Sequence, residues 1–241
     1  MHALCVETAG PLYGVALVDL PAGPAGAGDA GPLAEVTWRT SGRHGAELAS
    51  RIEALVADHG LRMGDLDGFL VDLGPGSYAG LRAGVSTVLA LASATGKPAA
   101  GVGRLELDAT PFRQAGMRCL AVHDAGGGDW AWAVVGPGGM ESGPRLGPAG
   151  SVGESVPEVD VVLGEVDAPL ADALRARFPG ARFAVARPWL RQAWWLAVGG
   201  WERLRAARAG DLAALQPWYL REPKITPSPK VRAGPIGPSE G

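Results

Sequence analysis

The chain is organised around the segment Gly74-Pro75-Gly76-Ser77-Tyr78-Ala79-Gly80-Leu81-Arg82-Ala83-Gly84. A short apolar run, residues 68–73, precedes it and is typical of a buried strand. Residues 81–95 follow, rich in alanine and leucine, and predict a helix. The segment is therefore a strand-turn-helix junction. Gly74, Gly76 and Gly80 give the turn conformational freedom, and Ser77 is a candidate N-cap of the helix.

Two interpretations of this turn follow from its residues. Backbone amides at the start of a helix favour an anion, so the turn is a candidate phosphate cradle. However, no Gly-Lys-Ser or Gly-Lys-Thr follows the glycines, and their spacing is not that of a dinucleotide-binding loop. Because glycines are common where a strand turns into a helix, we favour a tight structural turn and keep the phosphate cradle as the alternative.

The helix at 81–95 is unusually apolar. Arg82 is the one charged residue between Leu81 and Lys97, and alanine, valine and leucine leave no broad polar face. A helix that is apolar nearly all round must be covered on more than one side. Its own sheet would provide one cover. The other cover is either the rest of a large domain or the surface of a second protein.

Composition narrows the class of protein. With 241 residues, of which 47% are hydrophobic, the chain is long enough for one large or two small domains. A net charge of -3 gives no general attraction to nucleic acids or anionic membranes. Cys5 and Cys119 lie far apart in apolar runs, which indicates core thiols. We expect a cytoplasmic protein without a leader or a membrane span.

The first part of the chain has the order strand, strand, strand, helix, strand, helix, strand. These elements are expected at residues 3–8, 13–20, 33–40, 43–59, 68–73, 81–95 and 98–102. Three successive strands with short links predict an antiparallel meander. The Pro-, Ala- and Gly-rich residues 21–32 are expected to form a flexible hairpin tip.

The same order then begins again. A mixed segment, 103–116, is expected to start as a helix and to be interrupted by Pro111. Beyond it, strands are expected at 118–125, 130–135, 140–146, 159–164 and 182–186, with a helix at 168–178. We therefore predict a first subdomain at 1–103 and a second at 104–221, followed by a disordered tail at 222–241.

The longest helix is expected at 189–209, within the second subdomain but packing back on the first. One face carries large apolar side chains, namely Leu190, Trp194, Val198, Trp201 and Leu204. Aromatic residues at helical spacing are usually core, and we favour that interpretation over a cap that covers a ligand.

Few residues suggest chemistry. None of the histidines has the spacing of a metal pair, so no metal or cofactor is expected, and His44 and His59 are interpreted as solvated or helix-capping. His123-Asp124 ends a strand, and we favour a structural pair over a catalytic one. Glu7, at the end of the first strand, is a poor start for a nucleotide site. Because no nucleophile has a readable base and acid, no catalytic residue is predicted.

Residues 74–84 strongly resemble the GPGS(F/Y)TGLR(I/V)G signature of the TsaB (YeaZ) family. Four shorter segments resemble the family's LAIDT opening, its second strand, its H-x-E-x-L helix start and its closing P-x-YLR: residues 4–8, 13–17, 44–48 and 217–221. Two residues depart from the pattern. Ala79 replaces the usual Thr and Glu7 replaces the usual Asp, and both changes weaken a nucleotide-binding role more than a scaffold role.

The resemblance implies an α/β fold of the ASKHA type (actin-like ATPase, ribonuclease-H-like), made of two similar subdomains that each hold a mixed sheet flanked by helices. It also implies a non-catalytic subunit. Such a subunit binds the TsaD-type catalytic paralogue that transfers a threonylcarbamoyl group to the adenosine beside the anticodon of tRNA. A TsaE-type ATPase joins the larger complex, and such a subunit contacts tRNA only through that complex. The resemblance also implies that the same surface can form a homodimer.

In that family the helices of the first subdomain form the partner surface. We therefore expect the helices at 43–59 and 81–95 to pack side by side, with a combined surface at or beside Glu47, Arg51, Arg82, Val85 and Leu89. The rival hypothesis is an enzyme, either a small ASKHA phosphotransferase or a peptidase-like hydrolase that uses His123-Asp124 and the glycine turn. A free-standing homodimer with a separate binding role is the third.

Overall fold

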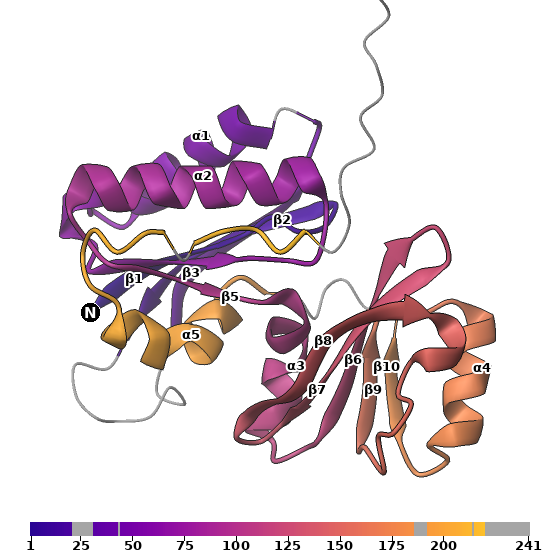
Figure 1. Ribbon diagram of the computed structural model, residues 1–241. Helices are drawn as coiled ribbons and strands as arrows, with labels where there is room; N and C mark the ends of the chain where they lie inside the picture. The colour runs from indigo at the N-terminus through magenta and orange to yellow at the C-terminus, as the bar shows by residue number, and fades with distance from the viewer. Residues whose placement is uncertain (21–30, 43, 186–191, 214, 220–241) are drawn as a thin grey trace, which may run out of the picture.

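The computed structural model describes residues 1–20, 31–42, 44–185, 192–213 and 215–219. Two five-stranded mixed sheets lie next to each other (Figure 1). The first sheet has the order β3 (Gly31–Arg39), β2 (Leu12–Asp19), β1 (His2–Glu7), β4 (Gly68–Asp72), β5 (Ala99–Val102). The second has the order β10 (Arg182–Val185), β9 (Val161–Gly164), β6 (Cys119–Gly126), β7 (Asp129–Gly136), β8 (Gly139–Pro148).

Both sheets have the same topology. In the first, β1, β2 and β3 form an antiparallel meander, while β4 runs parallel to β1 and β5 parallel to β4. In the second, β6, β7 and β8 form the meander, and β9 and β10 follow in parallel. The repeated element order predicted from the sequence is therefore confirmed, together with the antiparallel meander.

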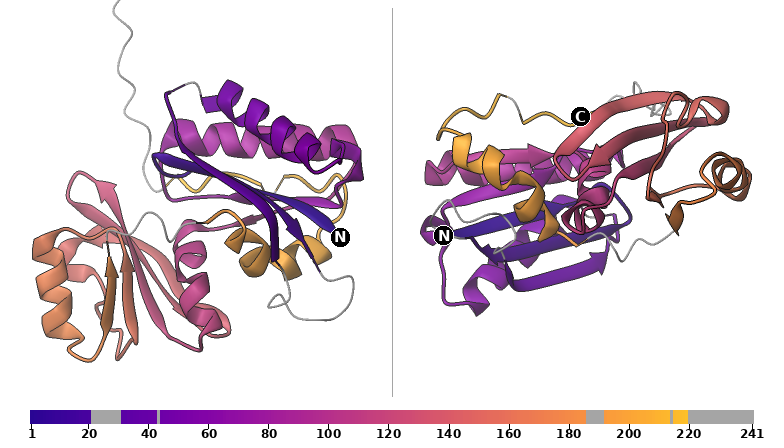
Figure 2. Two further views of the ribbon diagram at one scale, coloured as in Figure 1. Left: turned by 180° about the vertical axis from the view of Figure 1, so that it is seen from behind. Right: turned by 90° about the horizontal axis from the view of Figure 1, so that it is seen from below.

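Helices cover both faces of the first sheet. On one face, α1 (His44–Asp58) and α2 (Tyr78–Thr95) pack side by side, as predicted, over core residues such as Leu48, Val85 and Phe69. On the other face lies α5 (Trp195–Ala206), which comes from the end of the chain (Figures 1 and 2). Its Trp201, 1% exposed, packs with residues of β1, β2, β4 and β5. We call this sheet with α1, α2 and α5 the first half.

The second sheet is covered by α4 (Ala168–Arg177) on one face and by α3 (Arg104–Gln114) on the other. Two single turns, η2 (Met63–Asp65) and η3 (Ala149–Ser151), complete the described elements. We call this sheet with α3 and α4 the second half. Because α3 also contacts α5, it lies between the halves as well as on its own sheet.

Two expectations about helices were wrong. α3 continues through Pro111 to Gln114, since the proline stands near the helix end and only a few residues follow it. The long helix expected at 189–209 is α5, which spans Trp195–Ala206 and is shorter than the 18-residue α2. Gly199 and Gly200 are weak helix formers, and Gly200 lies against Leu70 and Val102, so packing on the sheet determines where the helix exists.

Some expectations fall outside the described residues: most of the hairpin tip at 21–32, Leu190, and the tail at 222–241. The boundary at 103/104 remains a prediction. Within the described ranges, none of the helices combines the length and apolarity that crossing a bilayer requires.

Candidate functional site

The glycine turn, residues 74–80, packs directly against the backbone of the β1–β2 turn. The Ser77 amide donates to the Ala9 carbonyl at 2.7 Å, and the Thr8 hydroxyl donates to the Gly80 carbonyl at 2.8 Å. A Cβ atom on Gly76 would collide with the Ala9 carbonyl, and one on Gly80 would collide with the Thr8 carbonyl. The glycines are therefore required by close backbone packing, which favours the structural turn over the phosphate cradle.

Ser77 is the N-cap of α2, as predicted, because its hydroxyl accepts a hydrogen bond from the Gly80 amide at 3.3 Å. At the start of the turn Gly74 has φ +94°, a conformation that favours glycine. Its amide donates to Asp72 Oδ1 at 2.7 Å, and its carbonyl accepts from the Arg104 amide at 2.7 Å. Hydrogen bonds of Gly74 therefore connect the turn both to the end of β4 and to the start of α3.

Two carboxyl groups are buried where β1 and β4 end. Glu7 is 2% exposed, and its Oε1 accepts from the Ala9 amide at 3.0 Å. Asp72 is fully buried, and its Oδ2 has no hydrogen-bond partner. Burial, and next the charge of Glu7, hold the pKa of Asp72 well above its usual range. The folded chain therefore holds the Asp72 proton to a higher pH than an exposed aspartate would.

An ionic cluster joins Arg104, at the start of α3, to His123 on β6 and Glu165 just after β9. Arg104 Nη2 donates to Glu165 Oε1 at 2.6 Å, and the other Glu165 oxygen lies 2.9 Å from His123 Nδ1. Arg104 is 1% exposed and also donates from Nη1 to the Pro75 carbonyl at 3.3 Å. The cluster therefore reaches from the second half to the glycine turn of the first.

His123 and Asp124 point to structural roles. Burial lowers the pKa of His123, although its hydrogen bond to the Glu165 carboxylate acts in the opposite direction. Asp124 Oδ1 accepts from the Gly126 amide at 2.7 Å and so shapes the hairpin end. Among the described residues no three His, Cys, Asp or Glu side chains gather as metal ligands. The arrangement favours the structural pair over the catalytic one.

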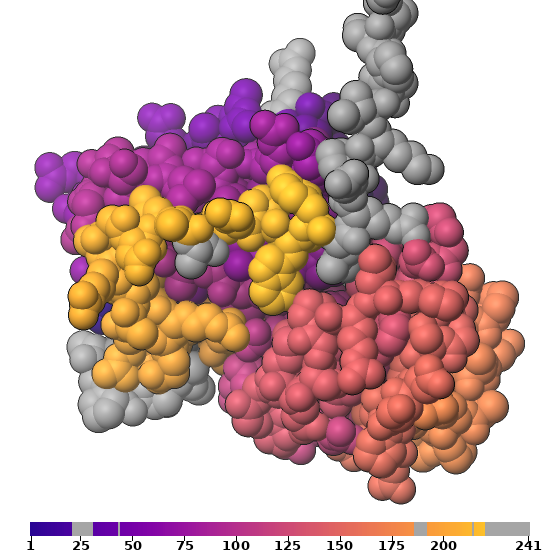
Figure 3. Space-filling model, viewed as in Figure 1, coloured from indigo at the N-terminus to yellow at the C-terminus, as the bar shows by residue number. Residues whose placement is uncertain are grey.

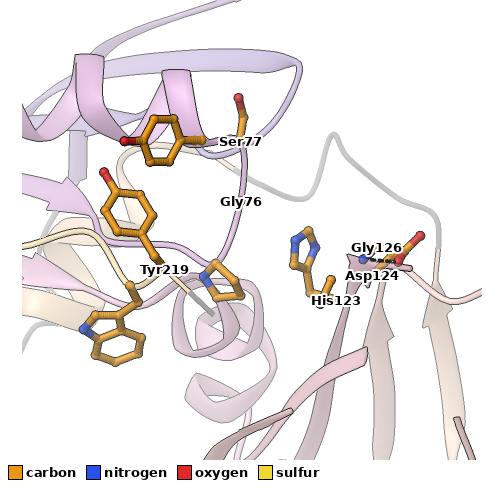
Figure 4. Close-up of a pocket in the computed structure, with 10 residues that line it drawn as sticks. Gly76, Ser77, His123, Asp124, Gly126 and Tyr219 are labelled. Carbon is orange, nitrogen blue, oxygen red and sulfur yellow. Dashed lines mark hydrogen bonds between the residues drawn. The ribbon is translucent and has the colours of Figure 1, made fainter. Parts of the chain in front are cut away.

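A cleft between the halves contains two hollows. The larger, about 400 Å³, lies between residues 75–78 of the turn and residues 123–126 of the second half, with Trp218 and Tyr219 at its edge. Figure 4 shows Tyr219 on one side of this hollow, with His123 and Asp124 on the opposite side. Figure 3 shows the yellow segment that ends at Tyr219 lying on the first half, beside the second.

The smaller hollow, about 320 Å³, lies on the other side of Ser77 and His123, which line both hollows. Its remaining polar lining comes from Tyr13, Thr40, His44, Arg104 and Glu165. Arg104 and Glu165 were not predicted as site residues, because no motif surrounds them and their partners are distant in the chain. Trp218 and Tyr219 lie in the closing segment that resembles P-x-YLR, yet no site was predicted there.

The predicted surface residues on α1, Glu47 and Arg51, both contact residues that precede the helix. Glu47 accepts from the Ser41 hydroxyl and from Trp38 Nε1, and the Ser41 hydrogen bond is the main reason that the pKa of Glu47 is lowered. Arg51 lies over the Trp38 ring, 5.5 Å from its centroid. Both residues therefore secure α1 against β3.

The histidines at the two ends of α1 differ in role: His44 is its first residue, and His59 follows its last. His44 is not simply solvated, because its Nδ1 lies 2.7 Å from the Tyr13 hydroxyl. The Nδ1 of His59 lies 2.8 Å from the Leu55 carbonyl at the helix end, in agreement with the capping interpretation.

On α2, Arg82 is exposed and donates to the Tyr78 hydroxyl at 3.3 Å. Leu89 is half-buried. Val85 is 3% exposed and packs in the core beneath α2, which corrects its placement on the predicted surface: a side chain inside the core cannot contact a partner.

Part of this chain is similar in sequence to known proteins. The TsaD family, described as tRNA N6-adenosine threonylcarbamoyltransferase, matches residues 38–142. The protein of that name from Paracoccus denitrificans is 33% identical over 159 residues, covering 61% of this chain and 42% of the relative. An uncharacterized protein from Mycobacterium tuberculosis is 37% identical over 109 residues, covering 45% of this chain and 50% of the relative. The chain thus spans about half the length of the curated relatives it matches.

Among solved structures, YeaZ from Pseudomonas aeruginosa is similar with a TM-score of 0.69 and 20% identity, covering 91% of this chain and 99% of that one. The predicted ASKHA-type fold of two similar halves is thereby confirmed. The chain therefore shares a sequence segment with TsaD-type proteins and its fold with YeaZ.

Proposed function

We propose that this chain is a non-catalytic subunit in the formation of N6-threonylcarbamoyladenosine in tRNA, and that it acts by binding a TsaD-type catalytic paralogue through the outward face of α1 and α2. The named relatives support the reaction, because they are tRNA N6-adenosine threonylcarbamoyltransferases. In this proposal a TsaE-type ATPase joins the complex, and tRNA is contacted through the complex.

The observation that carries the proposal is the face of α2 that the chain leaves uncovered. One side of the helix packs on the sheet through Leu81, Val88 and Ala92. The opposite side is exposed and carries mainly small side chains, at Ala79, Arg82, Ser86, Ala90, Ser93 and Ala94. Small side chains let a partner helix approach closely, and helices can pack at 8–10 Å when the contact residues are small.

α1 continues this surface. It packs beside α2 and exposes small residues, at Gly45, Ala46, Ala49, Ser50, Ala54 and Ala57, together with the charged Arg51, Glu53 and Asp58. The two adjacent helices thus form one face on which small side chains predominate. Such a face fits a pair of helices from a partner of related fold, and it fits a second copy of this chain for the same reason.

The end of α2 nearest the cleft adds aromatic residues to the surface. Tyr78, 41% exposed, and Tyr219, 43% exposed, lie with their ring centroids 4.9 Å apart, and Arg82 lies over the Tyr78 ring. Tyrosine and arginine are enriched among the residues that dominate binding energy in protein interfaces. We therefore add Tyr78 and Tyr219 to the proposed contacts Arg82 and Leu89.

The enzyme hypotheses have less support. A phosphotransferase needs free amides at the glycine turn, whereas the Ser77 amide is bound to the Ala9 carbonyl. A hydrolase that uses His123 needs that imidazole beside a nucleophile, whereas its described neighbours are Arg104 and Glu165. Both observations favour a subunit without its own catalytic centre.

The test is complex formation with the TsaD-type paralogue from the same source, measured by light scattering after size exclusion. The double variant Arg82→Glu with Leu89→Asp is expected to weaken pairing at least about 100-fold, as for hot-spot residues. Arg82→Glu with Ala90→Arg repeats the test at two exposed positions, should Leu89→Asp perturb folding.

The matched control changes two exposed residues of the second half in the same way, Arg175→Glu with Leu146→Asp, and should pair normally. Loss of tRNA modification in parallel with loss of pairing would support the proposal. Normal pairing by both α2 variants would refute the surface, and no pairing by the unchanged chain would refute the partner.

A further inference from the structure

The Arg104 side chain lies where the chain crosses from one half to the other. Arg104 follows β5 after a single residue, Gly103, and is the first residue of α3. Its amide donates to the Gly74 carbonyl at 2.7 Å, and its guanidinium donates to the Pro75 carbonyl at 3.3 Å. One residue of the second half is therefore bound twice to the glycine turn of the first.

Behind the guanidinium, the second half holds it in place. Glu165 accepts from Arg104 Nη2 at 2.6 Å, and His123 Nε2 lies 3.5 Å from Nη1. Asp108, one turn along α3, lies 3.8 Å from Nε. Because Arg104 is 1% exposed, these neighbours rather than water determine the orientation of its guanidinium.

The register of the two sheets gives this arrangement a symmetry. The parallel ladder of the first sheet ends at the pair Val6 and Val71, and that of the second ends at Val122 and Gly164. The next residues on these strands are Glu7 and Asp72 in the first half, and His123 and Glu165 in the second. Arg104 thus acts on equivalent pairs from both halves, since its charge partly opposes the burial and the Glu7 charge that raise the pKa of Asp72.

We propose that Arg104 is an internal cation that fastens the two halves to each other and keeps the cleft between them in one conformation. Glu165 and His123 orient the guanidinium, and the Pro75 carbonyl receives it. The cleft is consequently divided at Ser77 and His123 into its two hollows. The inference goes beyond the proposed function, and its test uses the chain alone, so failure to bind a paralogue leaves it unaffected.

The experiment measures the distance between the halves with spin labels on cysteines introduced at two exposed positions, Ser50 on α1 and Ala173 on α4. The native Cys5 and Cys119 are buried and can remain. The otherwise unchanged chain should give one narrow distance distribution. Arg104→Gln should broaden it or add a second distance, because the glutamine amide cannot reach both Glu165 and the turn.

Hydrogen exchange at the Ser77 amide gives a second readout, because that amide is protected by its bond to the Ala9 carbonyl. In Arg104→Gln we expect exchange to rise about tenfold. Glu165→Ala, at a side chain that is 40% exposed and so tolerates substitution, should give a smaller change in the same direction.

The control is Arg113→Gln on the same helix, whose guanidinium donates to the Pro137 carbonyl within the second half. It should leave both readouts unchanged. The proposal is overturned when Glu165→Ala and any folded Arg104 variant show the distance distribution and the Ser77 exchange of the unchanged chain. A change of equal size in Arg113→Gln would overturn it too, since the effect would then be general to α3.

Discussion

The two halves of this protein share a strand order and differ at the turn that follows the fourth strand. After β4, the turn Gly74–Ser77 packs against the Thr8–Ala9 backbone and leads into α2 of 18 residues. After β9, the chain passes through Gly164 and Glu165 to the N-cap Asp167 and an α4 of 10 residues. The same strand order is therefore followed by two different turns and by helices of different length.

The outward faces of these helices show what the difference means. α4 exposes charged residues, including Asp172, Arg175 and Arg177, two of which form an ion pair at 2.8 Å. That pattern is typical of a face in water. α2 exposes alanine and serine along most of its length. Of two equivalent helices, the one with the glycine signature is thus the one that we propose as the partner surface.

The largest loss of stability is expected from a substitution that removes the packing of α5 on the first sheet. Trp201→Ala removes a side chain that is 1% exposed and should lower the free energy of unfolding by about 4 kcal/mol, as for other buried aromatic truncations. Urea unfolding measures this change. Trp194→Ala, a half-buried neighbour stacked on Trp195, is the control and should cost much less. Equal losses in the two variants would contradict the assigned packing of α5.

A second prediction concerns the close approach that sets the first turn apart. Gly80→Ala places a methyl group against the Thr8 carbonyl and should cost about 3 kcal/mol through overpacking of rigid backbone. Gly45→Ala, also in a helix but with open space around it, should be neutral or slightly stabilising. Thermal or urea denaturation compares the two. A loss below about 0.5 kcal/mol in Gly80→Ala would show that the turn is not tightly packed.

The smallest effect concerns the buried carboxyl pair. Since the folded state raises the pKa of Asp72, it keeps a proton that the unfolded chain loses above 3.8. Its contribution to stability is therefore present at low pH and is lost as pH rises through the raised pKa. Asp72→Asn removes this dependence and should stabilise the chain at neutral pH by about 1 kcal/mol, because the unfolded chain no longer gains free energy by ionising this side chain.

The measurement is the melting temperature between pH 4 and pH 9, which should fall less steeply with rising pH in the variant. Asp67→Asn serves as control, because Asp67 is half-buried and accepts from the His2 amide at 2.9 Å. This control should not gain stability. If the melting temperature fell more steeply with rising pH in Asp72→Asn than in the unchanged chain, the raised pKa of Asp72 would be contradicted.

Much of the fold could be predicted because it depends on local patterns. The apolar runs at β4 and β9, the helix of residues 81–95 and the N-cap Ser77 are each encoded within a few neighbouring residues. The length of α5 could not be predicted in this way. Its sequence is helical over a longer stretch, and the extent of the sheet on which it packs determines where it begins.

The sequence by itself determined the order of the elements, the glycine signature and the absence of a readable nucleophile, because these are properties of residue type and spacing. Only the tertiary structure shows why glycine is required at positions 76 and 80: the Ala9 and Thr8 carbonyls of another turn pack against them. It also decided the partners of Arg104, which lie 19 and 61 residues away at His123 and Glu165. Such contacts depend on how two sheets are placed in space, and no local pattern specifies that placement.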